Sequence, residues 1–247
     1  MSLSSRAFQN WLNGVAEGAT TSEVCRAAGI KRTTLAQQLV RGKVTESTVV
    51  AIARAYGLNP LAELACFDGY RDLLTSHQQP TDAELLSQIS TEDLLADLAK
   101  RLSRANAKPW PDQLEVPALT PIPHSQSVRN WVDAVDTGEI RQQVSATMGV
   151  APQNFSAQLS ANRLAPELAV STARLAGLGP ASALVVTELI TPQEASWPEH
   201  AREKALARIP DSELAQLAAD RLQVMSRTLR KQEQDIAQRE QIWEHLG

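Results

Sequence analysis

The sequence is poor in aromatic residues, glycine and cysteine, and each shortage narrows the class of protein. Aromatic residues make up 4% of the 247 residues, and only 11 glycines stand beside abundant alanine and leucine. Because alanine and leucine favour helices, whereas strands are enriched in aromatic and β-branched residues, this composition predicts an all-α fold. The two cysteines, Cys25 and Cys66, form no C-x-x-C pair, which is typical of proteins in a reducing compartment.

The chain also lacks long apolar runs, metal-ligand clusters and catalytic motifs. No run approaches the roughly 18 apolar residues of a membrane span, and we expect no secretory leader. Neither a phosphate loop nor a nucleophile elbow is present. No metal-ligand spacing links the four scattered histidines, which are His77, His124, His200 and His245. We therefore expect a cytoplasmic protein that is not an enzyme, has no metal or cofactor, and does not bind a membrane.

An internal duplication organises the chain. Trp11 and Trp131 define an offset of 120 residues, at which 15 of the 60 residues in 7–66 are identical to those in 127–186. The identical pairs include Asn10 and Asn130, Gly18 and Gly138, Gly29 and Gly149, Gln38 and Gln158, Leu39 and Leu159, Arg54 and Arg174, and Pro60 and Pro180. Because chance does not place this many glycines and tryptophans in one register, we interpret the chain as a tandem repeat.

Each copy is predicted to form five short helices. The first begins after Ser4 or Ser5, ends at Glu17 and buries the apolar stripe Phe8, Trp11, Leu12 and Val15. Thr20 and Glu23 form a capping box for the second helix, and Gly29 ends it, since glycine adopts the left-handed conformation at little cost. A third helix at 31–40, a fourth capped by Thr45, and a fifth from Pro60 to Phe67 complete the copy.

This pattern predicts two domains joined by a linker. The first is expected at 1–104 with its core at 5–67, the proline-rich linker at 105–126, and the second at 127–247 with its core at 127–190. Helices follow each core, including a long C-terminal one from Asp211 to His245 in which Ala215, Leu222, Leu229, Ile236 and Trp243 recur every seven residues. Ala218, Met225 and Leu246 stand in the partner positions, and Gln232 and Arg239 interrupt this second row. That row predicts either a homodimer through residues 211–246 or a helix that folds back on its own domain.

These residues resemble the lambda-repressor-like (Xre) helix-turn-helix family over both 60-residue windows. The resemblance rests on the small residue four positions before Gly29, apolar residues one and six positions after it, and the tripeptide RGK at 41–43. The runs GIKRTTLAQQLVRGKV, AIARAYGLNP and ALVVTELITPQEA are also similar to immunity repressors of actinobacterial phages and prophages. One detail departs from the family, because Gln38 stands where an apolar residue is usual and Leu39 follows it. The resemblance implies two tandem helix-turn-helix domains in a sequence-specific transcriptional repressor that binds double-stranded DNA in the nucleoid.

The first copy carries a cationic recognition helix. Residues 31–43 contain four Lys or Arg and no Asp or Glu, although the net charge of the chain is −4. We expect base edges in the major groove to be read by Lys31, Arg32, Thr33 and Gln37. In this interpretation Arg32 pairs with guanine and Gln37 with adenine, while Lys31 also suits a phosphate. The further phosphate contacts are assigned to Thr21, Thr34, Arg41 and Lys43.

The second copy has exchanged most of these residues. Four Lys or Arg stand against five Asp or Glu over 127–190, so the electrostatic attraction to DNA is smaller. Base reading is assigned to Gln153 and Asn154, and phosphate contacts to Arg141 and Arg163. Two interpretations stay open for this copy, which are DNA contact and a structural or partner-docking role.

The alternative function is a protein-interaction adaptor, such as an antitoxin-like module or the partner of an anti-repressor. It would use the same helices for protein contacts, and the salt dependence of binding distinguishes it from a DNA-binding protein. Under the DNA-binding hypothesis, either one chain binds an asymmetric site with both copies, or a dimer binds a palindrome with the first copy alone.

Overall fold

The computed structural model describes residues 3–74, 78–105 and 118–246, and it is all-α, as the composition predicts. Within these residues the sheet structure is confined to β1 (Leu3–Ser4) and β2 (Lys43–Val44), which pair antiparallel with Leu3 opposite Val44. None of the described helices is both long and apolar enough to cross a membrane.

The first copy consists of α1 (Ser5–Val15), α2 (Thr21–Ala27), α3 (Arg32–Val40), α4 (Glu46–Ala55) and α5 (Pro60–Leu64), followed by the 3-10 helix η1 (Asp68–Leu73). Ser4 caps α1, and the predicted capping box of Thr20 and Glu23 is confirmed. Two predicted helix ends are wrong, because α1 stops at Val15 and α5 at Leu64. The chain turns into η1 after α5 because Tyr70 and Leu73, each 1% exposed, are drawn into the core.

The second copy repeats this order at the same offset. It consists of α8 (Ser127–Val135), α9 (Ile140–Met148), α10 (Pro152–Ser160), α11 (Pro166–Leu175) and α12 (Pro180–Val186). Gly149 ends α9 at φ +63°, and its counterpart Gly29 has φ +67°. Both glycines therefore occupy the left-handed region that the sequence pattern predicts for the end of a helix.

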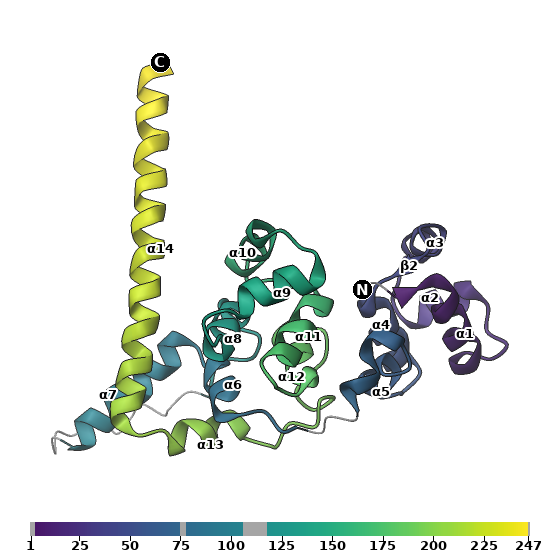
Figure 1. Ribbon diagram of the computed structural model, residues 1–247, viewed down its shortest axis with the longest axis horizontal. Coiled ribbons are helices and arrows are strands. Elements are labelled where there is room, and N and C mark those ends of the chain that lie inside the picture. Colours follow the sequence, from purple (N-terminus) through teal and green to yellow (C-terminus); the bar gives the residue numbers. More distant parts are fainter. Residues whose placement is uncertain (1–2, 75–77, 106–117, 247) are drawn as a thin grey trace. The chain divides into compact units, whose positions relative to one another are not determined.

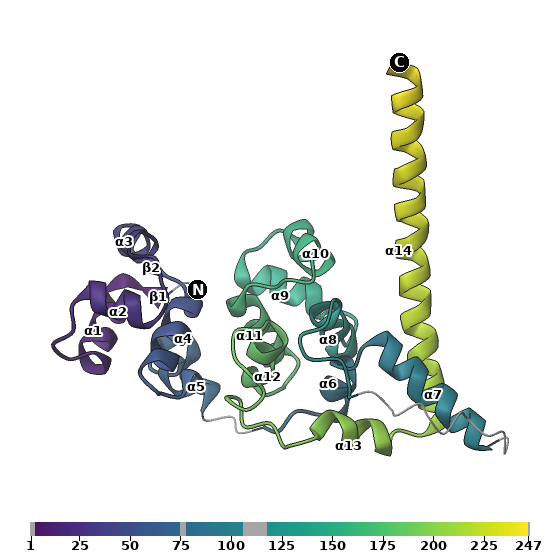
Figure 2. The same ribbon diagram turned by 180° about the vertical axis from the view of Figure 1, so that it is seen from behind.

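Contacts divide the chain into two compact units, shown in two views in Figures 1 and 2. Unit 1 comprises Met1–Gln88 and Pro121–Arg202, so it contains both five-helix copies and α6 (Asp82–Ser87), which packs on α8. Unit 2 comprises Ile89–Thr120 and Glu203–Gly247, so it pairs α7 (Thr91–Ala105) with α14 (Asp211–Leu246). The helix α13 (Ala201–Arg208) spans the boundary. The units thus cut across the division at 104 and 127 that the sequence suggests.

Part of the predicted proline-rich linker is packed. Most of it, residues 106–117, lies outside the described residues, and Ala105 is the last residue of α7. His124, however, is 8% exposed, accepts a hydrogen bond at Nδ1 from the Gln126 amide, and places Nε2 3.2 Å from the Ser87 carbonyl oxygen. The Asn162 side-chain amide also donates to the His124 carbonyl oxygen at 3.0 Å. Residues 121–126 therefore belong to the packing of unit 1 and are not an extended linker.

The predicted apolar row of the C-terminal helix is not the row that is buried within unit 2. Among the side chains of α14 described up to residue 238, the buried ones are Leu214, Ala218 and Arg221, whereas Leu222, Leu229 and Ile236 are 37%, 48% and 54% exposed. The helix does pair with α7, and Ala218, a partner position of the heptad row, is among its buried residues. Of the predicted row, Trp243 has a side chain outside the described residues.

Candidate functional site

The turn between α2 and α3 is fixed from inside. Val24, Cys25 and Leu35 are at most 3% exposed and hold the two helices together. Gly29 provides the left-handed turn, and the Ile30 amide donates to the Cys25 carbonyl oxygen at 2.9 Å. Burial raises the pKa of the Cys25 thiol, so this cysteine stays neutral and acts as a small core residue.

The outer face of α3 is exposed along its length. Leu35 points inward at 0% exposure, so residues on the opposite side of the helix, Thr33, Gln37 and Val40, form its outermost stripe. All of the residues predicted to contact DNA in this copy are exposed, namely Thr21, Lys31, Arg32, Thr33, Thr34, Gln37, Arg41 and Lys43. Sequence reasoning missed Val40, which is 88% exposed and lies one helical turn beyond Gln37.

The positive charge of this face is not neutralised by neighbouring carboxylates. In the described part of the chain, no carboxylate forms an ion pair with Lys31, Arg32, Arg41 or Lys43. Lys31 occupies the N-cap position of α3, so its side chain and that of Arg32 stand at the start of the helix. The two others follow the end of the helix, with Lys43 in β2. The four cations thus flank the outer stripe of Thr33, Gln37 and Val40.

Gln38, at a position where the sequence resemblance implies an apolar residue, positions α3 against the next helix. Its Oε1 accepts hydrogen bonds from the Thr45 amide at 3.2 Å and from the Thr48 hydroxyl at 3.0 Å. Thr45 is the N-cap residue of α4, as predicted, but its own side chain makes no capping bond. Gln158 does the same in the second copy, where its Oε1 accepts from the Ala165 amide at 2.9 Å. The sequence does indicate this role, because glutamine occupies both equivalent positions although the exposed residues of the two helices differ.

The second copy presents a more neutral face. Gln153 and Asn154 are exposed at the start of α10, behind Pro152, while Phe155 is buried. Arg141 forms ion pairs with Asp133 and Asp136, the latter at 3.2 Å, so much of its charge is compensated. Arg163 is exposed beyond the end of α10. Ser160 stands at the position equivalent to Val40 and is exposed as well.

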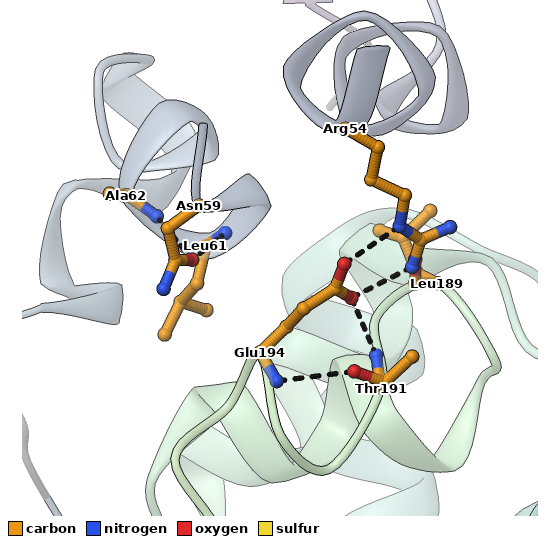
Figure 3. Close-up of polar contacts among 7 residues, drawn as sticks. All are labelled: Arg54, Asn59, Leu61, Ala62, Leu189, Thr191 and Glu194. Carbon is orange, nitrogen blue, oxygen red and sulfur yellow. Dashed lines mark hydrogen bonds and ion pairs between the residues drawn. The ribbon is translucent and has the colours of Figure 1, made fainter. Parts of the chain in front are cut away.

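The two copies are joined within unit 1 by a pair of arginines that sequence reasoning did not assign. Arg54 of α4 donates through Nε and Nη2 to both carboxylate oxygens of Glu194, each at 2.7 Å, and through Nη2 to the Leu189 carbonyl oxygen at 3.2 Å (Figure 3). Glu194 is held in turn by Thr191, whose amide donates to its carboxylate at 2.7 Å. The hydrogen bonds from Arg54 lower the pKa of the Glu194 carboxyl, so this pair is ionised at neutral pH.

The second arginine makes the corresponding contact from the other copy. Arg174 of α11 donates to both carboxylate oxygens of Asp72, with Nε at 2.7 Å from Oδ2, and to the Gly69 carbonyl oxygen at 2.7 Å. The hydrogen bonds from Arg174 lower the pKa of the Asp72 carboxyl. Val170, Leu184, Val185 and Ile190 of the second copy are buried in the same apolar cluster as the core of the first.

Among the described residues, no group of three or more His, Cys, Asp or Glu side chains is placed to hold a metal ion. Comparisons of the chain with protein-family models, with curated proteins and with solved structures found no match.

Proposed function

We propose that this protein is a sequence-specific regulator of transcription, acting as a repressor, that binds double-stranded DNA with the exposed face of α3. The observation that carries the proposal is the uncompensated cluster of Lys31, Arg32, Arg41 and Lys43 around a polar helix face. A protein of net charge −4 has no general attraction to nucleic acid, so attraction to the phosphates of DNA depends on a local cationic face.

The parts of this face suit different roles. Arg32 and Gln37 carry planar groups that form paired hydrogen bonds with guanine and adenine edges, respectively. Thr33 and Val40 flank them on the outer stripe and offer methyl groups to the base edges. Lys31, Arg41 and Lys43 lie at the two ends of α3, where phosphate contacts fix the register of a recognition helix.

A protein-interaction adaptor is the competing function, and salt separates the two. The affinity of the intact chain for its selected DNA should fall steeply between 50 and 200 mM salt, because several phosphate contacts release counterions. An adaptor would bind DNA weakly at every salt concentration and without preference for sequence.

The reading face is tested by substitution. We expect Arg32→Ala to weaken operator binding by about 1–3 kcal/mol and to relax specificity at one base pair. Lys43→Ala should instead weaken all sequences alike and reduce the salt slope by about one. If Arg32→Ala, Lys31→Ala and Gln37→Ala combined leave the affinity unchanged, this face does not bind DNA.

The form of the bound site follows from the difference between α3 and α10. Two unlike recognition helices in one chain should prefer an asymmetric site, whereas a dimer that reads only with α3 should prefer a palindrome. Footprinting combined with the mass of the complex decides between them. We expect each chain to occupy one asymmetric site with both copies, whether or not the chain is associated with a second one, and two chains that share one palindrome would assign a scaffold role to the second copy.

A further inference from the structure

The contacts between the two copies repeat when the copies are exchanged. Arg54 and Arg174 are equivalent in the duplication, and each donates to a carbonyl oxygen of the other copy. The two acceptors, Leu189 and Gly69, are also separated by the repeat offset. The bond from Arg54 to Leu189 therefore has its counterpart in the bond from Arg174 to Gly69. Reciprocal contacts of this kind are typical of twofold dimers, and here they join two copies of a domain within one chain.

The apolar part of the interface is also built from residues at equivalent positions of the two copies. Val50 and Val170 are equivalent, as are Leu64 and Leu184, and all four are at most 2% exposed in one cluster. Both pairs are identical in sequence, as the two arginines are. Because only 15 of the 60 aligned positions are identical, the interface has retained its residues while the outer faces of α3 and α10 have changed.

The carboxylates that bind the two arginines do not occupy equivalent positions, but their contacts have the same bidentate geometry. Glu194 and Asp72 are not equivalent positions, yet each receives two hydrogen bonds from its arginine. A bidentate contact between planar groups restricts their relative orientation as well as their distance. Two such contacts, together with an apolar cluster that both copies share, leave little freedom for one copy to rotate or slide against the other.

We propose that this interface sets the spacing of the two half-sites in the bound DNA, with Arg54 and Arg174 as positioning residues. The inference rests on the proposed function and additionally requires that both α3 and α10 contact DNA. The two helices lie on the same side of unit 1 in both views (Figures 1 and 2). Each inserted base pair moves one half-site by about 3.4 Å and turns it by about 35°, so rigidly joined helices fit a single spacing.

Two double variants break the interface while changing the net charge in opposite directions. Arg54→Gln with Arg174→Gln removes two positive charges, whereas Asp72→Asn with Glu194→Gln removes two negative ones. An effect on spacing that is common to both variants cannot arise from general attraction to DNA. Arg6→Gln with Arg227→Gln is the matched control, because these exposed arginines lie in α1 and α14, outside the interface.

The DNA experiment uses a site selected by the intact chain from a random double-stranded library, with two or five base pairs inserted between the protected segments. We expect the insertions to weaken binding of the wild-type and control chains at least tenfold, and that of both interface variants less than threefold. Specific binding that ignores the insertions in the wild-type chain, or an unchanged penalty in both interface variants, would overturn the inference. Failure to select any DNA would refute the proposed function instead.

A second measurement tests the interface without DNA. Spin labels on cysteines introduced at Thr33 and Gln153, in a Cys66→Ser background, report the distance between α3 and α10, because Cys25 is buried. We expect one narrow distance distribution in the wild-type chain and in the control, and broad ones in both interface variants. A broad distribution in the wild-type chain would overturn the inference whatever the DNA experiment gives.

Discussion

Asn59 and Gly179 occupy equivalent positions, yet only the asparagine provides a side-chain cap. Asn59 Oδ1 accepts hydrogen bonds from the amides of Leu61 and Ala62 at the start of α5 (Figure 3). Gly179 is the N-cap of α12, and a Cβ added there would lie 2.9 Å from the Gln78 carbonyl oxygen. The second copy has thus given up a good capping residue because the chain passes too close to that position.

This steric argument predicts opposite effects for two glycine substitutions. Gly179→Ala should destabilise the protein by about 1–3 kcal/mol, since an overpacked contact with backbone cannot relax easily. Gly14→Ala should stabilise it by about 0.5–1 kcal/mol, because Gly14 lies in α1 with open space around its Cα. Urea denaturation of the two variants measures both changes. Equal shifts in the same direction would contradict the proposed close approach at Gly179.

Gln38 gives a second prediction at the residue scale. Replacing it with leucine, an apolar residue of similar size, should destabilise the chain by about 1–2 kcal/mol. The reason is that the Thr45 amide and the Thr48 hydroxyl lose their shared acceptor, and Thr48 is only 4% exposed. Gln37→Leu is the control and should change the stability by less than about 0.5 kcal/mol, since Gln37 is exposed. Thermal unfolding of both variants provides the comparison, and equal melting temperatures would refute the assigned role.

At the scale of elements, local rules predicted much of the fold and could not predict the contacts between distant elements. The capping box at Thr20 and the left-handed Gly29 follow from residues within a few positions of each other, so the sequence displays them directly. Arg54 and Glu194 are 140 residues apart, and no periodicity links them. The identity of Arg54 and Arg174 was visible in the duplication, but it fits an exposed helix surface equally well.

The buried face of α14 was predicted only in part, for a related reason. A heptad count selects the most apolar row, whereas the buried row includes Arg221 at 8% exposure. An arginine in a buried row is not expected from hydrophobicity alone, because its burial depends on partners elsewhere in the fold. Arg101, at the equivalent position in α7, shows how such a residue is used, since its guanidinium donates to the Leu206 carbonyl oxygen of α13 and to Asp211 of α14.

Arg101 is therefore expected to hold α7 against the start of α14 in unit 2. It donates to Asp97 at 2.8 Å, to Asp211 at 2.9 Å and to the Ile209 carbonyl oxygen at 2.7 Å, which lies just beyond the end of α13. Arg101→Ala should destabilise this unit by about 2–3 kcal/mol, because charge-assisted bonds to a helix terminus are lost. Hydrogen exchange of the first turns of α14 measures the effect. The exposed Arg104→Ala should leave the exchange unchanged, and equal exchange in both variants would exclude this role.

At the scale of the whole molecule, the unpaired length of α14 needs an explanation. The helix has 36 residues against 15 in α7, and every residue from 227 to 238 is exposed. A single helix that packs against nothing gains no stability from burial and depends on weak local propensities. Leu222, Leu229 and Ile236 remain exposed at seven-residue intervals, which is the spacing of a helix that packs against a second one.

We accordingly expect the chain to associate with a second copy through this row, in a manner that depends on concentration. Leu229→Glu with Ile236→Glu should abolish the association, because two carboxylates would then be placed at the centre of an apolar contact. Gln223→Glu with Gln234→Glu adds the same charge on the opposite side of the helix and should leave it intact. Sedimentation of the three chains over a range of micromolar concentrations measures the outcome. A wild-type chain that stays monomeric throughout would mean that the row does not bind a second copy. Loss of association in both variants would mean that the added charge, and not the position of the substitutions, prevents it.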